Sequence, residues 1–140
     1  MLLFFLTYSA TTEKWIEMIK RLFNESTSVL EAKFEGEVNI LQIVEYIRET
    51  KDSDHYPRTL KILTDARNVI MNFKAEDLGV IVEENYKSLA KYDYIIDAFI
   101  LDSPTETALS ILFDELVKSN KYKFKIFSTI EAASKWLGNM

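Results

Sequence analysis

Two short segments, Thr59–Arg67 and Ile96–Asp102, constrain the fold of this chain more than any other part of its sequence. In the first segment Leu60 and Ile62 fall on one face of an extended chain, and Leu63 adds apolar surface to the other face. The second segment is apolar along almost its whole length. Strands that are apolar on both faces are typical of the interior of an α/β sheet, where helices cover both sides. We therefore predict that both segments are interior strands.

Strand and helix patterns alternate along the rest of the chain. Trp15–Phe23 and Ser28–Gly36 are predicted to form an antiparallel hairpin, although Trp15–Phe23 also fits a helical stripe. Asn68–Lys74 is predicted to be an irregular link. Helices are expected to begin near Asn39, Ala75, Ser103 and Ser128, and a last strand is expected at Tyr122–Phe127. This order predicts one α/β domain with a mixed, mostly parallel five-stranded sheet, built from the N-terminal hairpin and successive right-handed βα units.

Composition and charge narrow the function classes. At 140 residues, with 48% hydrophobic and 28% charged residues, the chain can form one globular domain with its own core. The net charge of -5 argues against a nucleic-acid partner, because nucleic-acid binders normally present a basic face. The absence of cysteine excludes disulfides, thiolate catalysis and cysteine-ligated metals, and it fits a reducing cytoplasm.

The N-terminal run Met1–Leu6 is apolar, but it is shorter than the apolar region of a secretory signal, and the first basic residue, Lys14, follows it. We therefore expect no signal peptide and a cytoplasmic location. No run reaches the roughly 18 apolar residues that a membrane span needs. Residues 1–14 are predicted to be an N-terminal extension and residues 15–140 the folded domain, with Met18 as an alternative start.

The helix after Ser103 has the clearest start signal in the chain. Ser103 suits the N-cap position, Pro104 suits the first helical position, and Glu106 would complete a capping box. The core face of this helix is predicted to be Leu109, Leu112, Phe113 and Leu116.

Four stretches of the chain carry a resemblance to a known family. They are Phe34-Glu35-Gly36-Glu37-Val38, Leu63-Thr64-Asp65-Ala66-Arg67, Asp102-Ser103-Pro104, and Phe127-Ser128-Thr129-Ile130-Glu131-Ala132-Ala133 running to Trp136-Leu137. In order and spacing, from about Met18 to Gly138, they resemble the STAS superfamily, and more closely its SpoIIAA-like (STAS/SEC14) branch of small bacterial proteins. The resemblance implies a right-handed βα superhelix on a mixed sheet. It also implies a non-enzymatic binding module for small apolar ligands, with membrane association suggested for some members.

One departure from the family concerns the loop after the central strand. STAS proteins that are switched by phosphorylation carry an Asp-Ser-Ser-Gly type loop there. In this chain the corresponding residues read Asp65-Ala66-Arg67-Asn68-Val69-Ile70-Met71, without serine, threonine or glycine. A phosphorylation switch at this position is therefore not expected.

The end of the central strand is the leading candidate site. Asp65 and Arg67 are two residues apart, so in an extended chain their side chains share a face, where they would hold a polar ligand group or a partner's charge. Asp102 and Ser103 end the next interior strand, and parallel strands open at the same carboxyl edge of a sheet. We predict these four residues to bind ligand. The alternative is structural, with Asp65 and Arg67 as an ion pair and Ser103 as an ordinary helix cap.

Metal and nucleophile chemistry find little support in the sequence. His55 is the only histidine and lies in a charged loop, and the acidic residues form no octahedral-site pattern. We therefore predict no metal site and no cofactor, and we assign no catalytic residue. Four aromatic residues would either line a cavity or pack in the core. They are Tyr86, Tyr92, Tyr94 and Phe113.

Three hypotheses for function follow. The leading one is a non-catalytic STAS-like module that binds a protein partner or a small apolar ligand. The second is an enzyme that uses Asp65 or Asp102 as a general acid or base, for which the carboxylate should be buried, with a raised pKa, beside a pocket. The third is a weakly membrane-associated protein that anchors through Met1–Leu6 and Val69–Phe73. The sequence does not indicate an oligomeric state.

Overall fold

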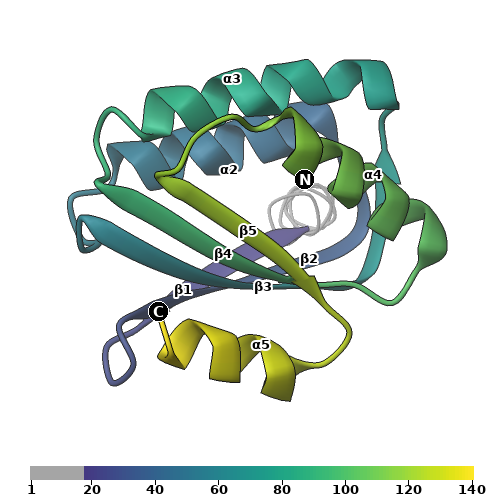
Figure 1. Ribbon diagram of the computed structural model, residues 1–140. Helices are drawn as coiled ribbons and strands as arrows, with labels where there is room; N and C mark the ends of the chain where they lie inside the picture. Colours follow the sequence, from purple (N-terminus) through teal and green to yellow (C-terminus); the bar gives the residue numbers. More distant parts are fainter. Residues whose placement is uncertain (1–17) are drawn as a thin grey trace, which may run out of the picture.

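A mixed five-stranded sheet in the order β1-β2-β3-β4-β5 forms the centre of the protein (Figure 1). The computed structural model describes residues 18–140. Strand β1 runs antiparallel to β2, and the other neighbours are parallel. The strands are β1 (Ile19–Asn24), β2 (Val29–Asn39), β3 (Thr59–Asn72), β4 (Tyr94–Ile100) and β5 (Tyr122–Phe127). The predicted fold class is confirmed, whereas the N-terminal extension and the start of the domain lie outside the described residues.

The helices cover the two faces of the sheet unequally. Helices α2 (Ile40–Asp52), α3 (Leu78–Ser88, after the short 3-10 turn η1, Ala75–Asp77) and α4 (Pro104–Leu116) lie on one face, and α5 (Ile130–Gly138) lies on the other (Figure 1). Two apolar cores result. The larger core lies under α2, α3 and α4, and a smaller one joins Ile96 and Ile100 of β4 to Leu137 of α5.

Strand β3 is longer than the sequence pattern predicts. Asn68–Lys74 was expected to be an irregular link, yet β3 continues to Asn72 and pairs there with the end of β2. The reason is a register shift opposite Lys33 and Glu35, where β3 carries an extra residue. Before this bulge the even-numbered positions, such as Ala66, are buried, and after it Val69 is buried while Ile70 is exposed. The bulge interrupts the alternation of buried and exposed residues. The sequence pattern therefore does not indicate that the strand continues beyond Arg67.

Helix α4 also differs from its prediction. Leu112 and Leu116 are 42% and 47% exposed, whereas Glu106, Ser110 and Phe113 are buried. The Ser103 side chain does not cap the helix; it donates a hydrogen bond to the Glu106 carboxylate. That carboxylate also accepts the backbone N–H of Met71 at 3.2 Å. The contact between Glu106 and β3 turns a polar side of the helix inward, which the apolar pattern alone does not indicate.

Candidate functional site

A cavity of about 100 Å³ lies between the sheet and the three helices α2, α3 and α4. Its floor comes from β2 to β5, and its roof comes from the helices. The bulge in β3 contributes to the cavity, because the change of register turns Met71 and Phe73 toward it. The lining residues are Phe34, Ile43, Tyr46, Ile47, Thr50, Leu60, Ile62, Met71, Phe73, Leu78, Ile81, Asn85, Ser88, Tyr92, Ile95, Asp97, Phe99, Leu109, Ser110, Phe113, Tyr122 and Phe124.

Aromatic rings make up much of the cavity wall. Phe99 packs against Phe34 with ring centroids 5.8 Å apart and against Phe124 at 5.3 Å. Phe113 of α4 lies edge-on to Phe124, also at 5.3 Å. Rings held in such tilted and edge-to-face contacts form a stiff apolar surface. The wall therefore favours an apolar occupant of defined shape.

An ion pair joins the roof helices α2 and α3, with its carboxylate buried and its guanidinium half-exposed. Glu84 is only 4% exposed, and Arg48 contacts its carboxylate at 3.0 Å. The hydrogen bond from Arg48 lowers the pKa of Glu84 in spite of its burial, with a further contribution from Lys87. The pair links α2 and α3, the helices that carry the cavity residues Tyr46 and Asn85.

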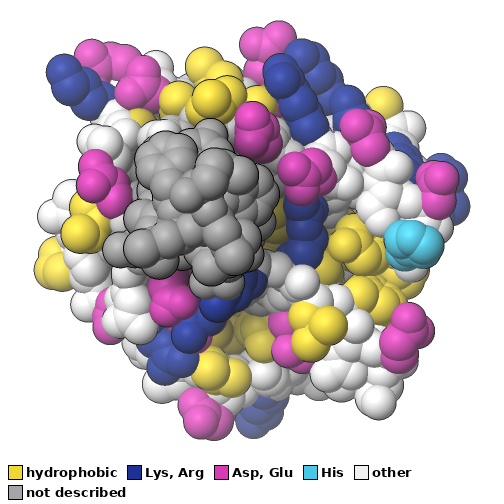
Figure 2. Space-filling model, turned by 180° about the vertical axis from the view of Figure 1, so that it is seen from behind, with side chains coloured by type: hydrophobic (Ala, Val, Ile, Leu, Met, Phe, Trp, Pro, Cys, Tyr) yellow, Lys and Arg dark blue, Asp and Glu magenta, His cyan; other side chains and the backbone are white. Residues whose placement is uncertain are grey.

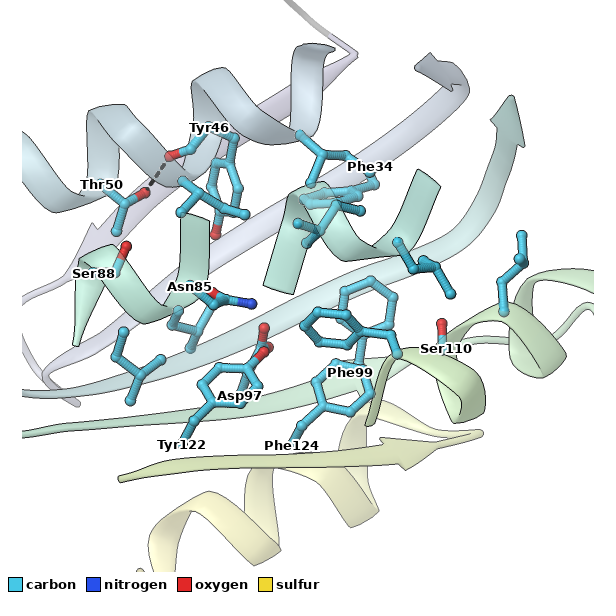
Figure 3. A pocket seen from close by; sticks show the side chains of 18 of the residues that line it. Phe34, Tyr46, Thr50, Asn85, Ser88, Asp97, Phe99, Ser110, Tyr122 and Phe124 are labelled. Carbon is cyan, nitrogen blue, oxygen red and sulfur yellow. Dashed lines mark hydrogen bonds between the residues drawn. The ribbon is translucent and has the colours of Figure 1, made fainter. Parts of the chain in front are cut away.

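Four polar side chains converge at one part of this apolar space (Figure 3). Asp97 projects from β4, and the Tyr46 hydroxyl from α2 and the Asn85 amide from α3 point toward it, with Tyr122 of β5 beside it. Asp97 accepts a hydrogen bond from the Thr64 hydroxyl of β3 at 2.9 Å. A few polar groups in an otherwise apolar pocket are the usual arrangement for small-ligand recognition.

The Tyr46 hydroxyl has no hydrogen-bond partner among the described residues, although its oxygen is fully buried. Its backbone carbonyl, by contrast, accepts the Thr50 hydroxyl at 2.7 Å, and the Arg21 guanidinium lies over its ring at 5.2 Å from the centroid. A buried polar atom without a partner costs roughly 1–3 kcal/mol. Tyr46 is therefore held in place by its surroundings while its hydroxyl stays available inside the cavity.

Burial dominates the electrostatics of this cluster. It raises the pKa of Asp97 to about 7, against the opposing effect of the hydrogen bond from Thr64. Asp97 is partly rather than fully buried, and the surface that it retains faces the cavity that it lines. Burial also raises the pKa values of Tyr46 and Tyr122, with Asp97 adding to both. Asp97 therefore changes its charge near neutral pH, while both tyrosines stay neutral.

The four residues that the sequence predicted to bind ligand lie outside this cavity. Asp65 and Arg67 form a two-pronged ion pair, with both N–H···O distances at 2.9 Å. The Arg67 hydrogen bonds lower the pKa of Asp65, although partial burial opposes them. Asp102 is exposed, close enough to interact electrostatically with Arg67, and Ser103 is engaged by Glu106. The strand ends bring Asp65, Arg67 and Asp102 together at one edge of the sheet, but none of the four predicted residues lines the cavity.

The structure adds Asp97 and Tyr46, which the sequence analysis did not single out. Asp97 had a signal: it is the one charged residue in the middle of a strand that is otherwise apolar on both faces, and aspartate is rarely buried without a purpose. Tyr46 has no comparable signal. Of the four aromatic candidates, Tyr92 and Phe113 line the cavity, whereas Tyr86 and Tyr94 are exposed.

Residues 18–140 provide neither a metal site nor a membrane-spanning helix. No group of histidine and acidic side chains in this part of the chain is arranged to hold a metal ion, and His55 is exposed. No described helix is long and apolar enough to cross a membrane. On the face shown in Figure 2, basic and acidic side chains are interspersed over the described residues, without a large area of one sign.

The fold has a counterpart among solved structures. The chain matches the crystal structure of an uncharacterized protein of the DUF3478 family from Shewanella loihica PV-4, which has a SpoIIAA-like fold. The TM-score is 0.56 at 13% sequence identity, and the match covers 85% of this chain and 91% of the other. No family model matches the sequence. No curated protein matches it either.

These findings define the class of protein at the level of its fold. The protein has a SpoIIAA-like α/β fold, as the resemblance to the STAS superfamily implied. At 13% identity the match shows the fold alone.

Proposed function

We propose that this protein is a non-catalytic, STAS-like binding module whose internal cavity takes a small, largely apolar ligand. The observation that carries the proposal is the buried Tyr46 hydroxyl, which lacks a partner among the described residues and faces a cavity walled by aromatic rings. A ligand with one polar group would satisfy that hydroxyl and fill the apolar space. We propose a bacterial cytoplasmic setting, which the absence of cysteine supports.

The size of the cavity limits the ligand. A dry protein cavity of about 150 Å³ can hold benzene. The cavity of about 100 Å³ in this protein is therefore expected to hold a molecule no larger than about the size of benzene. A protein partner would meet this space only through a single inserted side chain. The cavity therefore favours a small molecule over a protein partner.

Titration with pentanol, followed by two-dimensional amide NMR, tests the proposal. We expect saturable shift changes at residues of β4, α2 and α3 that surround the cavity. Ser110 lines the cavity from α4, so Ser110→Leu should fill it and abolish these changes. The matched control is Ser134→Leu on α5, an exposed position on the opposite face of the sheet, which should bind pentanol like the parent protein.

The proposal fails if the parent protein shows no saturable change, or if folded Ser110→Leu binds pentanol as well as the Ser134→Leu control does. Shift changes restricted to residues far from the cavity would also contradict it. The NMR spectra themselves report whether each variant is folded.

The second candidate function is an enzyme that uses a carboxylate as general acid or base, and the environment of Asp97 favours it. The enzyme hypothesis requires a buried carboxylate with a raised pKa beside a pocket. Asp65 has a lowered pKa and Asp102 is exposed, whereas Asp97 meets the requirement. The two functions differ in outcome: a binding module returns its ligand unchanged, and an enzyme converts it in a reaction that the Asp97→Asn variant does not perform.

A further inference from the structure

Among residues 18–140, the polar part of the cavity offers hydrogen-bond acceptors but no cation. Asp97 is the only acidic residue of this range that lines the cavity, and no lysine, arginine or histidine of the range lines it. The Arg21 guanidinium that approaches Tyr46 lies over its ring, on the β1 side, and donates to the Tyr46 carbonyl and to Thr50. No described side chain therefore supplies a positive charge to Asp97 inside the cavity, and a cationic occupant would supply one.

From this geometry we infer that the ligand is a small apolar amine, whose protonated nitrogen contacts Asp97 and Tyr46 while its hydrocarbon part lies against the phenylalanine rings. The inference deepens the proposed function and rests on it. An ammonium group supplies three donors and no acceptor. This matches the two acceptors that Asp97 and Tyr46 present, with no competing cation among the described lining residues.

The acceptors can be named individually. The only described hydrogen bond to Asp97 reaches Oδ1, from Thr64, which leaves Oδ2 for a donor from the ligand. The Tyr46 oxygen is buried without a described partner and can accept a hydrogen bond from the ligand. Asn85 lies beside these two groups and interacts with Tyr122, so Asp97 Oδ2 and the Tyr46 oxygen are the two acceptors for the ligand. Phe99 and Phe124 add aromatic surface beside Asp97, which also favours a cation.

A ligand with a carboxylate would meet the opposite situation. Its negative charge would face ionised Asp97 at close range, and like charges in a buried site repel strongly. The groups that surround Asp97 do not relieve this repulsion. They are the neutral side chains of Thr64 from β3, Tyr46 from α2, Asn85 from α3 and Tyr122 from β5, with the acidic Asp114 of α4 behind Tyr122. Charge thus separates amines from acids of equal length.

The test compares pentylamine, pentanol and pentanoate by amide NMR titration of the full chain. At pH 8 we expect pentylamine to bind at least about tenfold more tightly than pentanoate. Between pH 6 and pH 8 the affinity for pentylamine should rise about tenfold, because the complex requires ionised Asp97 while the amine stays protonated throughout. Pentanol binding should not depend on pH in this range, because pentanol carries no charge.

Asp97→Asn keeps the shape of the side chain and removes its charge. In this variant we expect the preference for amine over carboxylate, and the pH dependence, to disappear, while the amide spectrum reports whether the variant is folded. The pH dependence of the parent protein is an independent measurement, so the inference stays testable if Asp97→Asn does not fold.

The outcomes separate the two proposals. If pentanol binds the parent protein but pentanoate binds as tightly as pentylamine, the amine inference is wrong and the cavity-binding proposal stands. An amine affinity that is independent of pH, or an amine preference that persists in Asp97→Asn, overturns the inference in the same way. If none of the three compounds binds, both proposals are wrong.

Discussion

Asp97 is the acidic residue in the polar cluster of the cavity. It sits in the middle of β4, beneath α2 and α3, with a single described hydrogen bond from Thr64 to support it. Burying a carboxylate with so little compensation destabilises the folded state once the group is ionised. Thermodynamic linkage then makes the stability of the protein depend on pH.

The sign of this dependence follows from the raised pKa of Asp97. Between its ordinary pKa and about 7, the folded protein keeps the proton that the unfolded chain has lost, so stability falls as pH rises. We expect Asp97→Asn to remove this dependence. Relative to the variant, the parent protein should lose about 3 kcal/mol of unfolding free energy between pH 5 and pH 8, measured by urea unfolding.

Asp102→Asn is the matched control, because it makes the same chemical change at an exposed carboxylate. It should alter stability by no more than about 0.5 kcal/mol at either pH. An Asp97→Asn protein whose stability differs from the parent by the same amount at pH 5 and pH 8 would show that Asp97 is not held neutral by burial.

At the scale of the elements, the carboxylate of Glu106 joins helix α4 to strand β3. It lies in the first turn of the helix, is 7% exposed, and accepts hydrogen bonds from Ser103 and from the Met71 backbone. Burial alone would raise the pKa of Glu106, but these hydrogen bonds lower it. The contact positions Met71, which lines the cavity, against the helix that closes one side of it.

Glu106→Ala should therefore cost about 2 kcal/mol of unfolding free energy, because the Met71 N–H loses its partner in a partly buried place. Urea unfolding measures the effect. The control is Glu115→Ala, an exposed position on the same helix, which should stay within about 0.5 kcal/mol of the parent. Equal effects of the two substitutions would mean that the Glu106 contact does not stabilise the docked helix.

The sequence was sufficient to predict the elements whose periodicity is unbroken. Leu60 and Ile62 of β3, and the apolar run of β4, predict interior strands, and Asn39 forms the capping box of α2 with Gln42. The pattern fails at the bulge after Asp65, where one extra residue exchanges the two faces of β3. It also fails in α4, because the inward position of Glu106 depends on a backbone amide 35 residues away.

The candidate site was less predictable than the fold for a related reason. Side chains at strand ends, such as Asp65 and Asp102, can be found from local sequence. The cavity is assembled from three helices and four strands, and its polar part joins Tyr46, Asn85, Asp97 and Tyr122, which are far apart in the chain. No short-range pattern shows which of these side chains face one another.

At the scale of the whole molecule, the two candidate sites lie on opposite faces of the sheet. Leu63 packs in the core under α5, and Asp65 follows it on the same face, with Arg67 close enough to interact with Glu131 of α5. The cavity lies on the other face, under α2, α3 and α4 (Figure 1). The sheet therefore separates the charged cluster at the strand ends from the apolar cavity.

Arg67→Ala tests whether the two sites act independently. Arg67 and Asp65 keep 35% and 23% of their side-chain surface exposed, so loss of the ion pair should cost no more than about 1 kcal/mol. Because the pair does not contact the cavity, we expect Arg67→Ala to bind pentanol with the affinity of the parent protein, in contrast to Ser110→Leu. A folded Arg67→Ala protein that has lost pentanol binding would place ligand recognition at the strand ends, where the sequence had predicted it. Unchanged binding, together with a loss of stability much larger than about 1 kcal/mol, would instead make Asp65 and Arg67 a structural tie between β3 and α5.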